Sequence, residues 1–404
     1  MIPSELAAWS LLALGVVAVG LVANALAPVR RPDPLAIPSF FAAWLTGDLP
    51  VVHGVMYGLG AAVAVGLGGL DRGVGLVGLA LVSVALVGLV WVWRDSGRAA
   101  GRVDEALAQA GIEPVEAPPA RVRDVLRPFH VRRRNVQRTW RVTYATVGRR
   151  RLHLDIYRSA NAGADAPVLL FVHGGAWVIA FRDRQARPLL ERLAERGWVC
   201  VSAGYRLSPG ATFPDHLIDV KRAIAWIRAN IHSYGGNPEF LAIHGNSAGA
   251  HLASLAALTA NNRVYQPGFE TVDTSVVGCV PVYGPYDLTD RFGHWRFKQM
   301  GLFMRYVVMK CDPVRDREAY EAASPLCQIH EAAPPFFVVH GSSDSLVPVD
   351  EGRRFTAALR QQGVRCAYAE IPGGQHALDV FVSRRSLAVV AGIERFLEDL
   401  RRRA

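Results

Sequence analysis

Cysteine is scarce in this chain, and its spacing forms no pattern of metal ligands. The 404 residues include five cysteines, at positions 200, 279, 311, 327 and 366, with no C-x-x-C pair. An odd number at irregular spacing is neither a disulfide framework nor a zinc signature. We therefore predict no metal and no cofactor. Cys311 and Cys327 could form a bridge only if this part of the chain were extracytoplasmic.

Acidic residues are nearly absent from one basic stretch. Residues 121–151 contain eleven arginines and one acid, Asp124, so the whole net charge of +10 arises there. The stretch lacks regularly interleaved aromatic residues and any nucleic-acid-binding signature, so we predict no nucleic-acid partner. Two interpretations remain: contact with anionic lipid headgroups, or a solvated linker.

Charged side chains are missing from three long runs near the amino terminus. Residues 6–27, 51–70 and 73–93 contain no Asp, Glu, Lys or Arg. Each run matches the ~20 residues that a helix needs to cross ~30 Å of hydrocarbon. Only two residues separate the last two runs, which predicts a helical hairpin. Gly54 and Gly58 offer small residues for close packing between these helices.

A cleavable signal peptide is the alternative for the first run. Residues 25–27 resemble a cleavage site, but Glu5 precedes the run without any Lys or Arg, and Pro28 would follow the cut. These features favour a retained helix. We therefore predict three transmembrane helices within residues 1–97.

Arginines predict the orientation of these helices. Arg30 and Arg31 follow the first run, Arg94 and Arg98 follow the third, and the hairpin between the last two has only one arginine. Positive residues favour the cytoplasmic side. We expect a multi-pass protein of the cell membrane, with the bilayer as a partner and the rest of the chain in the cytoplasm.

The rest of the chain has no internal repeat and divides into two parts. Residues 98–137 contain four prolines and predict a basic linker with one short helix near 103–110. From residue 138 onward, two alternating strands flank Gly148, and apolar runs then alternate with helical patterns. This order is typical of a mostly parallel sheet covered by helices on both faces. We predict an α/β domain over residues 138–404.

A candidate nucleophile lies in residues 241–251. An apolar strand leads into a G-x-S-x-G pentapeptide centred on Ser247, and an alanine-rich helix follows. This is the strand–turn–helix context of a nucleophile elbow, in which small neighbours such as Gly245 and Gly249 allow a tight turn. An ordinary turn with an unremarkable serine fits the pentapeptide equally well, so the remaining site residues must decide.

An oxyanion hole is predicted one strand–helix–strand unit upstream. The strand 167–172 ends in His173, Gly174 and Gly175. Consecutive glycines let backbone N–H groups point toward one place, as a developing oxyanion requires. We predict Gly174, Gly175 and the amide of Ala248 as its donors. His173 is expected to fix the loop and not to transfer protons.

The acid and the base follow later strands. Asp344 comes after the strand 335–339, and His376 lies in a glycine-rich loop after the strand 366–371. Asp287 competes as the acid, but its strand is expected to lie beside the nucleophile strand, one strand too early. The order Ser247, Asp344, His376 is the one that α/β-hydrolases use.

These motifs resemble a known family. The segments His173-Gly174-Gly175, Tyr205-Arg206-Leu207 and Ser247-Ala248-Gly249 are similar to those of hormone-sensitive-lipase-like carboxylesterases, in the esterase/lipase branch of the α/β-hydrolases. Asn246 departs from the aspartate usual there. In Ala250-His251 and in His340-Gly341, Asp344 and Val347-Pro348, the chain resembles the related feruloyl-esterase-like, arylformamidase and prenylcysteine-methylesterase group. Membrane-anchored members occur among actinobacterial lipases and esterases. The resemblance implies a serine ester hydrolase of the α/β-hydrolase fold.

An aromatic- and methionine-rich insertion, residues 288–323, predicts a helical cap over Ser247 that suits an apolar acyl group; ordinary helix packing is the alternative. We expect hydrolysis of a small-molecule or lipid ester. The same residues could serve an amide or formamide hydrolase, or an acyltransferase. A non-enzymatic membrane scaffold would not require all three of Ser247, Asp344 and His376. No oligomeric state is predicted.

Overall fold

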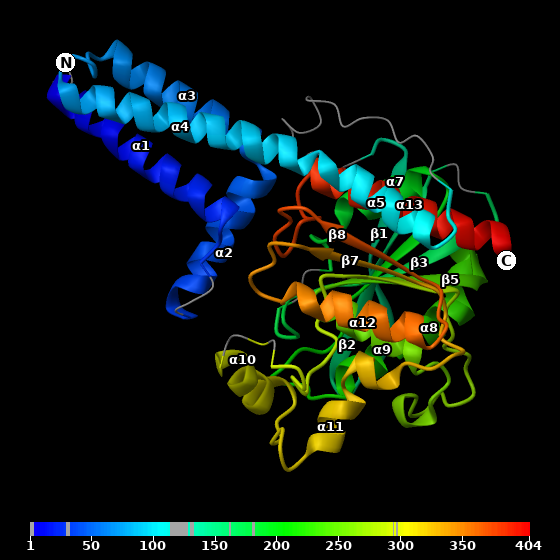
Figure 1. The fold of residues 1–404 in the computed structure, drawn as a ribbon. Coiled ribbons are helices and arrows are strands. Elements are labelled where there is room, and N and C mark those ends of the chain that lie inside the picture. The colour runs from blue at the N-terminus through cyan, green and yellow to red at the C-terminus, as the bar shows by residue number, and fades with distance from the viewer. Residues whose placement is uncertain are drawn as a thin grey trace.

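The computed structural model describes residues 4–29, 33–113, 128–129, 133–160, 163–179, 182–293, 295 and 298–404. Apolar amino-terminal helices project from an α/β domain (Figure 1). The helices are α1 Ser4–Leu26, α2 Asp33–Asp48, α3 Pro50–Gly66, α4 Gly73–Ser96, α5 Arg98–Gln109, α7 Arg187–Glu195, α8 Asp215–Asn230, α9 Ala248–Leu258, α10 Lys298–Phe303, a π-helical turn Met304–Val308, α11 Arg317–Ala322, α12 Val349–Gln361 and α13 Arg384–Arg403. The strands are β1 Val136–Val147, β2 Arg150–Ser159, β3 Ala166–Val172, β4 Val199–Ala203, β5 Gly236–Asn246, β6 Gly278–Val282, β7 Phe336–Gly341 and β8 Cys366–Ile371.

The eight strands form one sheet in the order β1-β2-β4-β3-β5-β6-β7-β8. The β1–β2 and β2–β4 pairs are antiparallel, and every later pair is parallel. The carboxyl ends of β3, β5, β7 and β8 therefore meet at one edge of the sheet. The predicted mostly parallel α/β fold is confirmed, and β6 pairs with the nucleophile strand β5, as expected.

Both faces of the sheet are buried, which explains the uninterrupted apolar strands. On β3, Val168 and Leu170 point into the core under α8, α9 and α12, while Leu169 and Phe171 point into the core under α5, α7 and α13. Because side chains alternate between the faces of a strand, a strand covered on both sides must be apolar at every position.

Helices α1, α3 and α4 pack side by side in the bundle that projects from the domain (Figure 1). A Cβ atom on Gly78 would lie 2.5 Å from the amide nitrogen of Leu12, and one on Gly15 would lie 2.7 Å from the Gly78 carbonyl oxygen. These glycines therefore let the backbones of α1 and α4 approach closely. Of the two glycines suggested for close packing, Gly54 faces α4, where a Cβ would lie 3.9 Å from Leu86 Cδ2 and Leu89 Cδ1. A Cβ on Gly58 would have no neighbour within 4 Å, so Gly58 makes no such contact.

Two of the described helices are long and apolar enough to cross a membrane, α1 and the continuous helix of α4 and α5. A third candidate exists only if α2 and α3, which meet at an angle of 91°, count as one bent span. The predicted span 51–70 is shorter than expected, since α3 ends at Gly66. Helix α2 was not predicted.

The predicted linker 98–137 begins as a packed helix. Ala99, Val103 and Leu107 of α5 are buried in the core beneath α13, and a Cβ on Gly392 of α13 would lie 2.4 Å from Val103 Cγ1. This helix confirms the short helix expected near 103–110 and continues α4 into the α/β domain. Residues 114–127 and 130–132, with much of the basic stretch, lie outside the described residues. Within the described part, Arg138 forms an ion pair with buried Asp155 at 2.9 Å.

Candidate active site

Ser247 lies on a sharp turn between β5 and α9. Its backbone has φ 54° and ψ −121°, a conformation that is strained for a residue with a side chain and typical of a nucleophile elbow. The turn requires glycine on both sides: a Cβ on Gly245 would lie 2.2 Å from the Gly249 carbonyl oxygen, and one on Gly249 would lie 2.0 Å from the Val172 carbonyl oxygen.

Three predicted residues from separate loops form one hydrogen-bonded chain. Ser247 Oγ lies 2.9 Å from His376 Nε2, and His376 Nδ1 lies 2.8 Å from Asp344 Oδ2. These distances lie within the range at which a histidine can accept the proton of an attacking serine. The loops meet because β5, β7 and β8 are parallel and end at the same edge.

Asp344 is held in its charged form. The backbone N–H groups of Leu346 and Val347 each donate to Asp344 Oδ1 at 2.9 Å, and His340 Nε2 lies 3.3 Å from Oδ2. Burial alone would raise the pKa of Asp344, but the charges and hydrogen bonds of His376 and His340 hold it well below its usual value. A carboxylate in this state orients the imidazole and stabilises its protonated form.

The other candidate proton-transfer groups have structural contacts. Asp287 accepts hydrogen bonds from Thr289 and Arg291, and among the described residues no hydrogen bond joins it to His376. His173 is fully buried, stacks on Tyr205 with ring centroids 4.4 Å apart, and lies 2.7 Å from the Gly174 carbonyl oxygen. Burial lowers the pKa of His173 to about 4, so it is neutral at physiological pH.

The predicted oxyanion donors differ in availability. The Gly174 N–H already donates to Gln185 Oε1 at 2.7 Å. Glycine at position 174 instead allows the backbones of Gly174 and Asn246 to approach closely, because a Cβ there would lie 2.7 Å from the Asn246 carbonyl oxygen. In the described part of the chain, the amides of Gly175, Ala176 and Ala248 have no acceptor. Gly175 and Ala176 both have positive φ, 118° and 50°, which turns successive N–H groups to one side.

Asn246 is explained by a buried partner that the sequence did not reveal. Its amide Nδ2 donates to Asp379 Oδ2 at 2.6 Å, and the Tyr283 hydroxyl donates to the other carboxylate oxygen. The Tyr283 ring lies 4.6 Å from the His376 ring. An aspartate at position 246 would face a second carboxylate, whereas asparagine supplies a donor.

Sequence reasoning also missed residues of α2 that touch the histidine loop. The rings of Phe40 and His376 lie 6.2 Å apart, nearly edge to face. Trp44 Nε1 donates to the Ala377 carbonyl oxygen at 3.0 Å, and its ring stacks on Phe381 at 4.8 Å. The available signal was the cluster of Phe40, Phe41 and Trp44, three aromatic residues within five positions.

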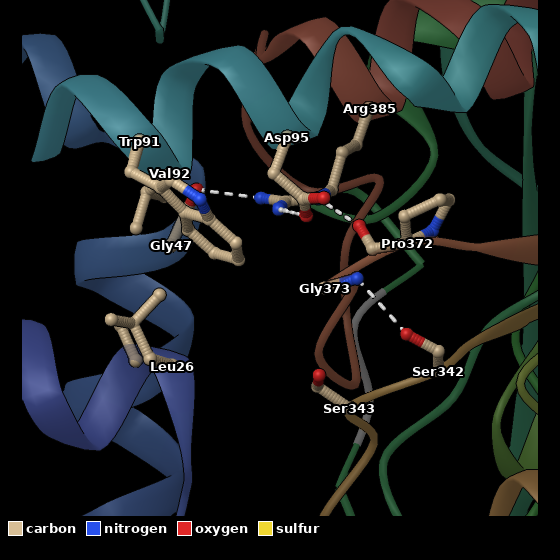
Figure 2. A pocket seen from close by; sticks show the side chains of 11 residues that line it. Leu26, Gly47, Trp91, Val92, Asp95, Ser342, Ser343, Pro372, Gly373 and Arg385 are labelled. Atoms are coloured by element: carbon tan, nitrogen blue, oxygen red, sulfur yellow. Dashed lines mark hydrogen bonds and ion pairs between the residues drawn. The ribbon is translucent and has the colours of Figure 1, made fainter. Parts of the chain in front are cut away.

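Arg385 connects the helices to the loop that carries His376. Its side chain donates to the Gly47 and Pro372 carbonyl oxygens, each at 2.8 Å, and lies 3.5 Å from an Asp95 carboxylate oxygen. Figure 2 shows it between α4 and the loops after β7 and β8, beside a cavity of about 270 Å³. The guanidinium therefore fixes α2 and α4 relative to the site.

The predicted cap, residues 288–323, forms α10, a π-helical turn and α11, with part of it outside the described residues. Met304, Val308 and Tyr320 are buried in the domain core, which agrees with the alternative of helix packing for these three. Leu302 and Tyr306 are exposed. A cap over Ser247 therefore stays a prediction.

The described residues contain no group of three His, Cys, Asp or Glu side chains placed to hold a metal ion. All five cysteines are free, and Cys200, Cys279 and Cys366 are buried, as their apolar surroundings predicted.

This sheet, with its nucleophile elbow after β5 and an acid and a histidine after β7 and β8, defines an α/β-hydrolase. Residues 154–359, about half of the chain, match the BD-FAE family. The chain belongs to this family, within the esterase/lipase branch of the α/β-hydrolases.

Curated relatives and solved structures agree. Esterase LipQ of Mycobacterium tuberculosis (strain ATCC 25618 / H37Rv) is 47% identical over 268 residues, which cover 66% of this chain and 63% of LipQ. Esterase LipC of the same organism is 37% identical over 364 residues, covering 88% of this chain and 89% of LipC. The structure of Thermogutta terrifontis esterase 2 phosphonylated by sarin is 25% identical, with a TM-score of 0.55, and covers 63% of this chain and 91% of that one. The chain thus spans less than two thirds of LipQ but most of LipC.

Proposed function

We propose that the chain is a membrane-anchored serine hydrolase that cleaves carboxylic esters with apolar acyl groups through an acyl-enzyme on Ser247. The observation that carries this proposal is the hydrogen-bonded chain from Ser247 Oγ through His376 to Asp344, with distances of 2.9 and 2.8 Å. Names of the relatives support it, since LipQ and LipC are both described as esterases.

Acylation begins when Ser247 Oγ attacks the ester carbonyl carbon while its proton moves to His376 Nε2. The carbonyl oxygen becomes an oxyanion, for which Gly175 and Ala248 are the predicted donors with free amides. We add Ala176, whose amide is also free, and assign Gly174 to shaping the turn. Each such donor contributes ~10²–10³ in kcat.

Collapse of the tetrahedral intermediate expels the alcohol, which takes the proton from His376. Water then attacks the acyl-enzyme, with His376 again acting as base, and releases the acid and free Ser247. Throughout, the Asp344 carboxylate holds the imidazole tautomer that leaves Nε2 free to accept a proton.

Two measurements test this function. A fluorophosphonate probe should label the wild-type protein and not Ser247→Ala. A series of p-nitrophenyl esters should be hydrolysed by wild type and lose ~10⁴-fold or more in kcat in Ser247→Ala. Ser83→Ala is the matched control, because Ser83 Oγ donates only to the Leu79 carbonyl oxygen within α4. Equal rates of ester hydrolysis in wild type and Ser247→Ala would contradict an acyl-enzyme on Ser247.

The alternatives give different products. An acyltransferase would pass the acyl group to an added alcohol faster than to water. An amide or formamide hydrolase would prefer the matched anilide to the p-nitrophenyl ester. An inert scaffold would neither bind the probe nor hydrolyse any ester.

The cytoplasmic placement is also a proposal, supported by the arginines that follow the first and third apolar runs. In Figure 1, the amino terminus lies at the end of the bundle away from the domain, so both can lie on opposite sides of a bilayer. Protease added outside intact cells should leave the hydrolase domain uncut. Cleavage of the domain from outside would reverse the orientation.

A further inference from the structure

Helix α2 has one face against the candidate active site. Its buried residues Ala36, Phe40 and Ala43 recur at helical spacing, and Phe40 reaches the His376 ring. The Trp44 indole holds the same loop through Ala377. A segment more than 300 residues earlier in the chain thus contributes an aromatic wall beside the histidine.

The opposite face of α2 is apolar and exposed. Leu35, Ile37 and Phe41 are 55%, 51% and 51% exposed, and Leu45 is 37% exposed. No charged residue occurs between Asp33 and Asp48. A helix that is apolar on all sides is surrounded by apolar material, and its outer face is a docking surface in need of an occupant.

The orientation of α2 relative to the bundle indicates what covers its outer face. The bundle also exposes apolar side chains, among them Val17, Leu59 and Val87. Helix α3, which packs along the bundle, meets α2 at 91°. If the bundle crosses a bilayer, α2 therefore runs parallel to the membrane plane, as interfacial helices do.

Contacts near the middle and at the end of α2 hold it in this position. Near its middle, the Asn24 amide of α1 donates to the Ser39 carbonyl oxygen at 2.8 Å. At its end, Arg385 donates to the Gly47 carbonyl oxygen at 2.8 Å. The helix is therefore fixed to both the bundle and the histidine loop.

We propose that α2 is an interfacial helix with its outer face in lipid and its inner residue Phe40 forming the acyl-binding wall. The enzyme then takes long-chain acyl esters directly from the bilayer, because one helix contacts lipid on its outer face and lies beside His376 on its inner face. This inference rests on the proposed ester hydrolysis for its substrate, but its lipid contact can be measured without catalysis.

Lipid contact is tested with fluorophores at Ile37→Cys and Leu45→Cys, in a Cys311→Ser/Cys327→Ser background, reconstituted in phosphatidylcholine vesicles. Nitroxide-labelled lipids should quench both positions several-fold more than a fluorophore at Val314→Cys, where the native side chain is 84% exposed in the α/β domain. Quenching by aqueous iodide at positions 37 and 45, with none by nitroxide lipids, would overturn the interfacial helix. Disulfide cross-linking between copies at these positions would instead assign the face to a second copy of the chain.

The acyl wall is tested with Phe40→Ala and a chain-length series of p-nitrophenyl esters in detergent. We expect kcat/KM for the laurate to fall at least about tenfold more than for the acetate, mainly through KM, because the lost ring removes apolar contact with the long chain. Phe40→Leu should restore the preference, and Val17→Ala on α1 should keep the wild-type profile. An equal fall for every chain length would overturn the wall and leave Phe40 a packing residue. Wild-type protein that hydrolyses none of the esters would contradict the proposed function, while the quenching result would still determine whether α2 contacts lipid.

Discussion

The α/β domain and the amino-terminal bundle bury different kinds of side chain. In the bundle, the core consists mainly of aliphatic residues such as Leu11, Ala18 and Val82. In the domain, buried charged and polar groups such as Asp155, Asp219 and Asp344 lie among the apolar ones, each with hydrogen-bond partners. The domain therefore depends on the charge state of specific residues, whereas the bundle depends on side-chain size.

Asp344→Asn tests the polar side of this comparison most strongly. We expect kcat for p-nitrophenyl butyrate to fall ~10⁴-fold, because an amide can hold His376 in the wrong tautomer. Asp287→Asn is the matched control and should lose less than about tenfold, since the Asp287 carboxylate accepts from Thr289 and Arg291 of its own turn. A larger loss of kcat in Asp287→Asn than in Asp344→Asn would show that Asp287, and not Asp344, is the acid that acts on His376.

Acid should destabilise the domain before the bundle. Burial lowers the pKa of His173, His244 and His251 to about 4, whereas an unfolded histidine titrates near ~6.5. Between these values the unfolded chain binds protons that the folded chain excludes, so stability falls as the pH drops from 6.5 to 4, by up to about 3 kcal/mol per histidine. Above pH 6.5 these histidines are neutral in both the folded and the unfolded chain, so they contribute nothing to the pH dependence of stability.

The measurement is thermal unfolding between pH 7.5 and pH 5, followed by near-ultraviolet circular dichroism for the domain and by protease resistance for the bundle. The bundle should respond less to pH than the domain, because His53 is the single histidine before residue 130. A domain melting temperature that does not change with pH would contradict the prediction.

Asn246→Asp should place two carboxylates against each other. Because Asn246 Nδ2 now donates to Asp379 at 2.6 Å, the variant loses a donor and gains a buried charge. We expect about 2–3 kcal/mol of destabilisation. The exchange Asn246→Asp with Asp379→Asn should recover most of this, since it restores one donor and one acceptor. A double variant no more stable than the single one would show that the pair is not coupled.

Gly78→Leu addresses the bundle and has the smallest expected effect. The new side chain has no room beside Leu12, so we expect about 1–3 kcal/mol of destabilisation in detergent. Gly58→Leu should be nearly neutral, because a Cβ there meets nothing within 4 Å. Hydrolysis of a water-soluble ester below the melting temperature should be unchanged in both. Equal melting temperatures would contradict the close approach of α1 and α4.

Much of the domain could be predicted because its signals are local. The strand 167–172 is a continuous apolar run, and β1 and β2 alternate around Gly148, whose φ is +57°. The order of Ser247, Asp344 and His376 followed from the strand ends, since parallel strands bring their carboxyl ends to one edge. The roles of these residues remain predictions for the experiments above.

Other features depend on partners far away in the chain. Nothing near Asn246 reveals Asp379, and nothing near Gly174 reveals that Gln185 occupies its amide. The apolar pattern of α2 gives no preferred face, so its contact with His376 could not be inferred. The sequence predicted a short helix near 103–110 but not that it packs on α13, because composition does not identify the surface against which a helix packs.

The sequence by itself determined the strands, the nucleophile turn and the order of the candidate site residues, because each arises from neighbours along the chain. Tertiary structure decided which amides are free for an oxyanion, why position 246 carries asparagine, and that α2 lies beside His376. The physical reason is the same in each case. Hydrogen bonds and packing contacts between distant segments form only when the sheet and the helices have brought those segments together.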